Sequence, residues 1–501
     1  MASAMSRGFC GIALTALGCV LAAAGSAGAE TLADAVALAY QSNPILQGAR
    51  AAQRAIDETY VQAQAGYRPT VSVRADVATD RNNYLSSVVL LPGENPAITK
   101  GDTQTSGATL TINQPLYTGG RVSSAVNAAK AGVLAGREQL RATEQTVLDS
   151  VIQAYVDVRR DEESLQIAQE NVALLQNQLG ESNAKFDVGQ ATRIDITQSD
   201  ARLADAQAAL AMTQAQLDGS RAAYVATVGQ SPTRLAEPPT LAGLLPIGLD
   251  QAFSAAEQNN PQLRRSNYAE QASAARVAEA RAQTRPTVSL QANLGYSGGN
   301  YGSATPFANY SHDISVAAVV TVPVFNGGLT LSQVRQALEN NAVDRIGIEA
   351  ARRQVVLTVA KAWSQMIGLR AGVSARERQV AAADLAFQGV REGAVVGMRS
   401  TLEVLIAEQD RSNAKLALAN AKHDEYLAAA TLLAAVGGLR VEDLTPGAPI
   451  YDPKTNFDHV RHAWGWTPWE PAVAAIDRIG APKIVELPPA GAAFGPAAPP
   501  R

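Results

Sequence analysis

Cysteine, histidine and aromatic residues are scarce in this sequence. Its 501 residues include two cysteines, Cys10 and Cys19, and four histidines, and aromatic residues make up 5%. Both cysteines lie in the first 29 residues, so no disulfide, zinc or thiol chemistry is expected in the rest of the chain. Few aromatics, with Ala, Gln and Leu dominating the middle, favour long helices over a compact mixed core.

Net charge and long apolar runs are also lacking. A net charge of −4 does not indicate a nucleic-acid partner. No run of 18 apolar residues follows residue 30, so no helix is expected to span a bilayer. The chain has no nucleophile elbow, no phosphate-cradling glycine loop and no set of metal ligands. We therefore expect no enzyme, no catalytic residue, no cofactor and no metal site.

Residues 1–29 have the pattern of a secretory signal peptide. Arg7 supplies the positive end, residues 9–24 are mostly apolar, and small residues precede Glu30. A mitochondrial presequence is a weaker alternative, because one arginine is too few. Lipidation at Cys19 is a further alternative, although the preceding leucine stands one position off the usual pattern.

A strand, a glycine joint and a long helix follow one another around residues 114–120. Before this stretch, apolar residues at 108, 110 and 112 alternate with polar ones, as in a strand with one apolar face. The joint itself contains Pro115, Gly119 and Gly120. After it, apolar residues fall seven apart, which is typical of a helix packed along its whole length. These residues are Val151, Val158, Leu165, Val172 and Leu179. They predict a helix of about 60 residues, or about 90 Å.

The same pattern occurs a second time, 208 residues later. Pro323, Gly327 and Gly328 repeat the joint, as positions 119 and 327 show. The matching heptad residues are also apolar: Val359, Met366, Val373, Val380 and Phe387. Five matches at one offset indicate an internal duplication.

The duplication divides the chain into two repeats, 30–236 and 237–444, and a Pro-rich tail, 445–501. The predicted strands cover about 70–79, 106–114, 287–296 and 312–322. The predicted long helices cover about 119–183 and 327–391, and the return helices cover 190–229 and 398–437. The strands have the length of membrane strands and form two hairpins, with loops at 80–105 and about 297–311.

Four strands cannot close a barrel, and open sheet edges are not tolerated in lipid. The chain is therefore expected to oligomerise through its hairpins, and three copies would supply twelve strands. Tyr67, Tyr117 and Phe325 lie at strand–helix junctions, where aromatics resemble a membrane-interface girdle. Ordinary edge packing is the alternative for these three residues.

The tail shows no periodicity. Residues 485–501 are rich in Pro, Ala and Gly and are expected to be disordered. Trp464, Trp466 and Trp469 cluster in the tail, close to His459 and His462. A metal site on the two histidines is an alternative, but a peripheral tail without a site is favoured.

Four kinds of signal recur in order in both repeats. They are the Asn-Pro helix starts at 43–44 and 260–261, the Arg-Pro-Thr strand openings at 68–70 and 285–287, the two glycine joints, and the Val-Gly turns Val188-Gly189 and Val396-Gly397. Together they resemble the TolC family of outer-membrane exit ducts, over about residues 30–440. The resemblance implies a mixed α and β membrane protein, a homotrimer whose twelve-stranded β-barrel in outer-membrane lipid continues into a twelve-helix periplasmic α-barrel. It also implies a periplasmic adaptor (membrane fusion) protein and an inner-membrane transporter of the ABC or RND type as partners.

The resemblance further implies a periplasmic gate at the helix tips. It places Asp195, Arg399 and Glu403 at the constriction, and the two Val-Gly turns at the adaptor-docking tips. An Asp195–Arg399 link would hold neighbouring helices closed, and a ring of Glu403 carboxylates would raise their pKa values. Ala394 and Ile406 depart from the family's pattern, so an apolar constriction is an alternative. Solvated helix ends are another.

The predicted function is a passive outer-membrane channel, the exit duct of type I protein secretion, because the tip and joint sequences look closer to that branch. The first alternative is the exit duct of a small-molecule efflux pump. The second is a periplasmic coiled-coil scaffold or adaptor, which would explain the heptads but not the four alternating strands.

Overall fold

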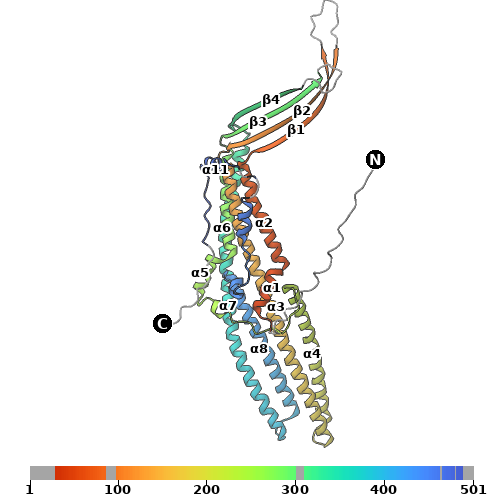
Figure 1. Ribbon diagram of the computed structural model, residues 1–501. Helices are drawn as coiled ribbons and strands as arrows, with labels where there is room; N and C mark the ends of the chain where they lie inside the picture. Colours follow the sequence, from red (N-terminus) through yellow and green to blue (C-terminus); the bar gives the residue numbers. More distant parts are fainter. Residues whose placement is uncertain are drawn as a thin grey trace, which may run out of the picture.

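A computed structural model describes residues 29–85, 98–300, 310–462, 465, 467–479 and 481–488. The described chain is a long helical body with a β-sheet at one end (Figure 1). Several predicted segments lie outside the described residues: 1–28 of the signal peptide, 86–97 and 301–309 of the two hairpin loops, Trp464 and Trp466, and 489–501 of the tail end. Residues 485–488, which were also expected to be disordered, are described and make hydrogen bonds to α6 (Pro261–Ala282).

The sheet is a four-stranded antiparallel meander in the order β1-β2-β3-β4. Its strands are β1 (Thr70–Leu85), β2 (Ile98–Tyr117), β3 (Thr287–Asn300) and β4 (Ser311–Thr321). The strands of the first hairpin have 16 and 20 residues, longer than predicted, and the predicted loop from residue 80 to 105 is partly strand. Asp80, for example, pairs with Thr103. Backbone pairing continues there through polar residues, which lack the alternation of apolar side chains from which a strand is predicted.

Cross-strand pairing gives the sheet one apolar and one polar face. Val71 pairs with Ile112, Ile112 with Ala292, and Ala292 with Val316, so these four residues form one apolar row. The next residues along each strand form a polar row on the opposite face: Ser72, Thr111, Asn293 and Ser315. Side chains alternate between the faces of a strand, so the predicted alternation extends across the whole sheet.

Two helices of 67 residues form the body, α3 (Arg121–Asp187) and α7 (Leu329–Val395). Each spans about 100 Å at 1.5 Å per residue. Near the sheet, α3 packs against α2 (Pro44–Gln64) and α6 (Pro261–Ala282), and α6 also packs against α7. Further down, α3 and α7 are covered by their return helices α4 (Arg193–Val228) and α8 (Thr401–Ala435). Short helices thus lie beside each long one.

Side-chain caps set where the shorter helices begin. Asn43 accepts a hydrogen bond from the Ile45 N–H at the start of α2, and Asn260 does the same for Gln262 in α6. In both helices a proline follows the cap, where its missing N–H costs no intrahelical hydrogen bond. The helices before these caps are α1 (Leu32–Ser42) and α5 (Leu249–Asn259), and two 3-10 turns cover Ala65–Tyr67 and Ala242–Leu244.

The core lies at mid-height, where α1, α3, α8 and the linker between the repeats meet. Val151, Val158, Val359 and Met366 from the predicted heptads are buried there. Tyr155 is also buried, and its hydroxyl donates hydrogen bonds to the carbonyls of Glu30 and Ala236. Val373 and Val380 further down α7 are only half-buried, as are Leu165 and Leu179 on α3, so neither heptad stripe is fully covered within one chain.

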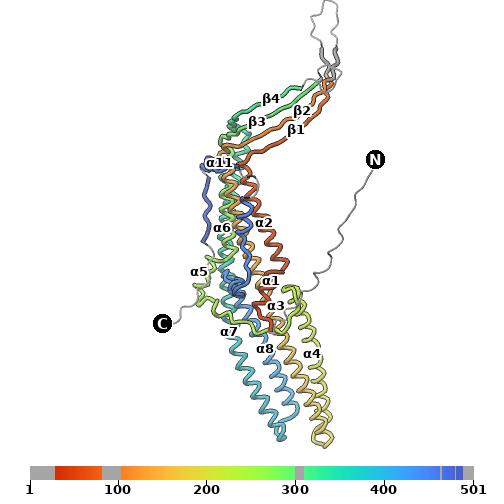
Figure 2. Tube along the Cα trace, in the orientation of Figure 1, coloured from red at the N-terminus to blue at the C-terminus, as the bar shows by residue number. Residues whose placement is uncertain are grey.

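The tail is packed against the body, which corrects the expectation that it is merely peripheral. After α9 (Val441–Leu444), it contains α10 (Pro453–Val460) and α11 (Glu470–Asp477). Figure 2 shows it returning along the body to the junction with the sheet. Tail residues 482–487 then bond to α3 and α6, since the Asn127 amide donates to the Pro482 carbonyl and Leu487 N–H donates to the Tyr268 hydroxyl. No signal of period 2 or 3.6 marks such short helices.

We expect Gly437→Ala to destabilise the fold more than its repeat counterpart Gly229→Ala. Both glycines end a return helix with positive φ, +77° and +98°, which costs another L-residue about 1–2 kcal/mol. A Cβ at 437 would also overlap the Asn259 carbonyl and lie 2.9 Å from the Asn260 nitrogen, whereas at 229 it would lie 3.4 Å from the Ser42 Oγ. Thermal unfolding of the purified variants measures the difference. Equal losses would contradict the packing at Gly437.

Candidate functional site: helix tips and strand–helix joints

The two tips of the body have the same turn. Gly189 and Gly397 adopt positive φ, +75° and +77°, directly after the valines that end α3 and α7. The Gln190 N–H then donates to the Lys185 carbonyl at 2.7 Å, and the Met398 N–H donates to the Gly393 carbonyl at 2.8 Å. This is the capping pattern in which glycine satisfies the last carbonyls of a helix. Both predicted Val-Gly turns therefore reverse the chain in the same way.

Apolar side chains are exposed around both turns. Val188 and Ile194 project at the first tip, and Val396 and Met398 project at the second. Each tip also carries its own capping box. These grouped apolar side chains make each tip a candidate contact surface.

The predicted gate carboxylates begin the return helices. The Asp195 carboxylate accepts hydrogen bonds from the Thr192 N–H and hydroxyl, both at 2.8 Å. The Glu403 carboxylate accepts from the Ser400 N–H at 2.7 Å and hydroxyl at 3.0 Å. Reciprocal bonds complete a capping box at each site. Arg399 then bonds to the second oxygen of Glu403 at 2.8 Å.

These contacts change the predicted gate within one chain. Among the described residues, no hydrogen bond or ion pair joins Asp195 to Arg399, because the two hairpin tips lie apart (Figure 1). The hydrogen bonds from Thr192 lower the pKa of Asp195. The Ser400 N–H, then Arg399, lowers the pKa of Glu403, opposite to the rise expected for a ring of carboxylates. Any such rise would have to come from neighbouring copies.

A glycine makes room for the Arg399 side chain, which the sequence did not reveal. A Cβ at Gly393 would lie 2.8 Å from the Arg399 Cγ. The arginine stem therefore lies across the last turn of α7 before its guanidinium reaches Glu403 on α8. Gly393 gives the arginine stem its space, so the side chain packs on α7 while its guanidinium pairs with α8.

Buried polar contacts hold each helical hairpin together above its tip. Ser182 and Ser199 share a hydrogen bond of 3.2 Å between α3 and α4. Between α7 and α8, Arg411 bonds to Asp384 at 2.6 Å and lies over the Phe387 ring. Arg411 also pairs with Glu408, whose pKa is raised by burial despite this partner.

One histidine links the two repeats. His423 on α8 contacts Asp157 on α3 at 2.8 Å and its neighbour Asp424 at 2.9 Å. Burial alone would lower its pKa, but the two aspartates outweigh burial and raise it. The protonated form therefore favours the contact between α3 and α8.

The strand–helix joints bend at glycine. Gly119, Gly120, Gly327 and Gly328 all have positive φ, between +67° and +86°. Pro115 lies at an irregularity in the β2–β3 pairing, and Pro323 lies in the segment after β4. A Cβ at Gly119 would lie 2.7 Å from the Arg285 Cβ, whereas nothing in the chain lies within 4 Å of one at Gly327. The first joint is packed by the second repeat, and the second joint is bare within the described chain.

The predicted interface aromatics do not share one environment. Tyr67 is only 4% exposed and packs with Val122, Val473 and Ala474, so it cannot serve as a surface aromatic. Burial raises its pKa. Tyr117 is half-buried, and Phe325 is almost fully exposed. Tyr67 is corrected from a membrane-facing residue to a core residue, because the tail covers it.

The sequence also missed the group that caps α3. The Asp477 carboxylate of α11 accepts hydrogen bonds from the N–H groups of Thr118, Gly120 and Ser123, at 2.7, 3.1 and 3.0 Å. Gly120 has no side chain with which to cap the helix. Because Asp477 lies more than 350 residues away, no local motif could have indicated it.

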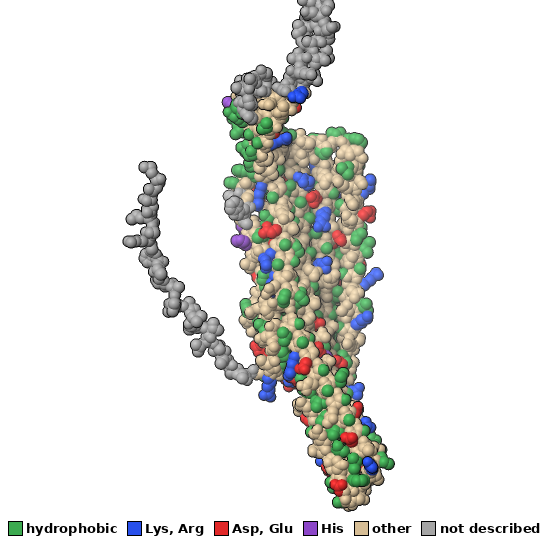
Figure 3. Space-filling model, turned by 90° about the vertical axis from the view of Figure 1, so that its right-hand side faces the viewer, with side chains coloured by type: hydrophobic (Ala, Val, Ile, Leu, Met, Phe, Trp, Pro, Cys, Tyr) green, Lys and Arg blue, Asp and Glu red, His purple; other side chains and the backbone are tan. Residues whose placement is uncertain are grey.

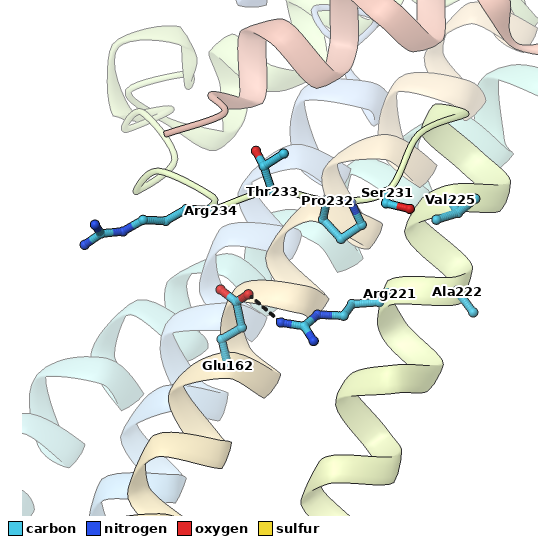
Figure 4. A pocket seen from close by; sticks show the side chains of 8 residues that line it. All are labelled: Glu162, Arg221, Ala222, Val225, Ser231, Pro232, Thr233 and Arg234. Carbon is cyan, nitrogen blue, oxygen red and sulfur yellow. Dashed lines mark hydrogen bonds and ion pairs between the residues drawn. The ribbon is translucent and has the colours of Figure 1, made fainter. Parts of the chain in front are cut away.

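A shallow pocket at the end of α4 is bridged by an Arg221–Glu162 ion pair of 3.4 Å (Figure 4). It presents no nucleophile with an adjacent base. No group of three His, Cys, Asp or Glu residues in the described part could hold a metal ion. Hydrophobic side chains and charges of both signs are interspersed over the face in Figure 3. No described helix is long and apolar enough to cross a bilayer.

Comparisons with known proteins support the resemblance. The chain matches the family described as Outer membrane efflux protein over residues 35–230 and 252–438. It is 32% identical over 435 residues to the outer membrane efflux protein BepC of Brucella suis, covering 87% of this chain and 91% of BepC. It is 26% identical over 349 residues to the alkaline protease secretion protein AprF of Pseudomonas aeruginosa, covering 67% of this chain and 70% of AprF.

Among solved structures, a crystal structure of CusC has the same fold. The TM-score is 0.70 at 21% identity, over 82% of this chain and 93% of that one. The matched family residues cover both repeats and stop at residue 438, so the docked tail lies beyond them. The chain therefore belongs to the outer membrane efflux protein family, the family of TolC, and is an outer-membrane channel protein.

Proposed function

We propose that three copies of this chain close into a ring, a twelve-stranded barrel continuous with a helical tunnel. The duplication supports this arrangement. Within the chain, β2 of the first repeat pairs with β3 of the second, and α6 lies between α3 and α7. Repeating the same step between copies pairs β4 with the next copy's β1 and places the next α2 against α7.

The observation that carries the proposal is a difference in exposure between equivalent positions of α3 and α7. Leu148 on α3 is 3% exposed, whereas Val356, its counterpart 208 residues later, is 45% exposed. Glu138, which bonds to Arg264 of α6, is 6% exposed, whereas its counterpart Ile346 is 69% exposed. The second repeat thus exposes apolar residues at positions where the first repeat is covered by neighbouring elements. A neighbouring copy would cover them in the same way.

We expect Val356→Asp to break the trimer and Ile247→Asp to leave it intact. Both side chains are exposed in one chain, so neither charge disturbs the fold of a protomer. Only Val356 lies at the proposed interface, where burying an unpaired charge costs several kcal/mol. Native mass spectrometry in detergent counts the copies. A Val356→Asp trimer as robust as the parent would refute this interface.

We propose that the tips form the closed end of the duct and dock a periplasmic adaptor. Capping boxes fix Asp195 and Glu403 at the starts of the return helices, and the Arg399–Glu403 pair joins the turn after α7 to the first turn of α8. Three-fold symmetry would gather these charges into a ring. The exposed valines of the Val-Gly turns, Val188 and Val396, offer an apolar rim for the adaptor. Ile406, which is also exposed, would narrow the same opening.

Arg399→Ser is expected to raise single-channel conductance in planar bilayers up to several-fold. The change removes the contact with Glu403 while the capping box remains. Glu403→Gln should act similarly, because glutamine also completes a capping box. Glu403→Ala should raise conductance further, since it also removes the cap. Arg376→Ser on exposed α7 surface is the matched control. If neither Arg399→Ser nor Glu403→Ala changes conductance, these charges do not gate the channel.

The proposed duct needs a source of energy and a cargo. We propose an inner-membrane transporter, reached through the adaptor, as the source of energy, because the described chain shows no site for nucleotide chemistry. The sequence favoured an unfolded protein delivered by type I secretion, and the name of AprF supports that class. The name of BepC, the more similar of the two relatives, favours efflux as a second candidate.

Deleting the gene and complementing it distinguishes the two cargo classes. Loss of type I secretion removes specific proteins from the culture medium without changing drug susceptibility. Loss of efflux lowers the inhibitory concentrations of several unrelated small molecules. The Val356→Asp variant should fail to complement either defect. A deletion strain with unchanged secretome and unchanged susceptibility would contradict both cargo proposals.

A further inference from the structure

The last helix of the tail, α11, is fixed to the first strand–helix joint. Besides the three N–H groups of the joint, the Asp477 carboxylate accepts from the Thr118 hydroxyl at 2.9 Å and is completely buried. Glu470, at the other end of α11, pairs with Arg68 at 3.0 Å, and both side chains are largely buried. Val473 and Ala474 cover Tyr67 between these contacts. One face of this short helix is therefore held at both ends.

The register of the sheet shows on which side α11 lies. Trp469, directly before the helix, donates its indole N–H to the Gln114 side chain at 2.9 Å. Gln114 stands two and four residues after Ile112 and Leu110 on β2, so it belongs to the apolar face. It also pairs with Leu290 of the same face. Trp469 thus lies at the foot of the apolar face, and α11 lies where the strands meet the helices (Figure 1).

Ile476 of α11 and two apolar residues that flank the helix, Trp469 and Ile479, are exposed in the described chain. Trp469 is 49% exposed, Ile476 52% and Ile479 69%. Arg478 and Lys483 are exposed beside them. A short helix with apolar residues, a tryptophan and flanking cations has the composition of a segment at a membrane–water interface.

We propose that α11 and Ile479 contact lipid at the periplasmic surface of the outer membrane. The inference rests on the proposed barrel, in which the apolar face of the sheet meets lipid. Ile476 and Ile479 continue this face below the strands and enter the headgroup region, while Arg478 and Lys483 meet phosphate groups. Asp477 and Glu470 hold the helix at this level. The tail thus supplies the interface aromatic that the buried Tyr67 does not.

Cysteine labelling tests the contact, because the described chain contains no cysteine. Single cysteines at Ile476, Ile479, Ile314 and Met212 are spin-labelled in the trimer reconstituted in phosphatidylethanolamine–phosphatidylglycerol nanodiscs. Ile314 on the apolar face of β4 is the lipid reference, and exposed Met212 on α4 is the aqueous reference. Collisions with oxygen report lipid, and collisions with a water-soluble nickel chelate report water.

The labels at Ile476 and Ile479 are expected to show oxygen collisions several-fold above those at Met212, and nickel collisions well below. Values equal to those at Met212 would overturn the proposal. So would labels shielded from both reagents, which would mean that a second copy covers α11. If the Ile314 label is also aqueous, the barrel itself is refuted. If only the α11 labels are aqueous, the duct stands and the lipid contact fails.

Discussion

The constraint on which this structure depends is that the backbone groups along the two outer edges of its sheet need partners. Among the described strands, β1 and β4 each pair on one side only. An unpaired N–H or C=O in hydrocarbon costs several kcal/mol, so these edges cannot remain open in an outer membrane. One chain cannot remove them, whereas a closed ring does. In the proposed ring, the neighbouring copy that pairs these edges would also cover the apolar residues of α7 that are exposed in one chain.

Glycine residues set the positions at which the chain bends between the sheet and the helices and at the helix tips. The tips and the joints turn through residues with positive φ, and the chain is regular for 67 residues between them. Each return helix then starts from a capping box, which fixes the carboxylate at its third position. Within one chain, Asp195 and Glu403 therefore act as helix caps. Any role at a constriction uses charges that folding has already oriented, which keeps them in place without further cost in side-chain entropy.

The sequence predicted the parts of this structure that repeat at short range. Alternation identified the apolar face, heptads identified a stripe that is buried or half-buried on both long helices, and the glycines identified the sharp bends at the tips and joints. It did not predict the full length of β1 and β2, because pairing continues through residues such as Asp80 that carry no apolar signal. It predicted a contact between Asp195 and Arg399 that one chain does not make. It missed Asp477, whose partners are brought to it only by the fold.

The two repeats share their sequence pattern, but the tail contacts only one of them and so makes their strand–helix joints different. A chain has two strand–helix joints but one C-terminal segment, so one joint receives a cap and the other does not. Asp477 satisfies the N-terminal N–H groups of α3, whereas no described side chain caps Gly328 at the start of α7. Arg285 donates to the Gly119 carbonyl at 2.9 Å, while its counterpart Arg68 is engaged by Glu470 of the tail. In a trimer, three joints held by Asp477 would alternate with three joints that only a neighbouring copy can cover. The six similar repeats of the ring would then be related by three-fold rather than six-fold symmetry at the level where the sheet enters the membrane.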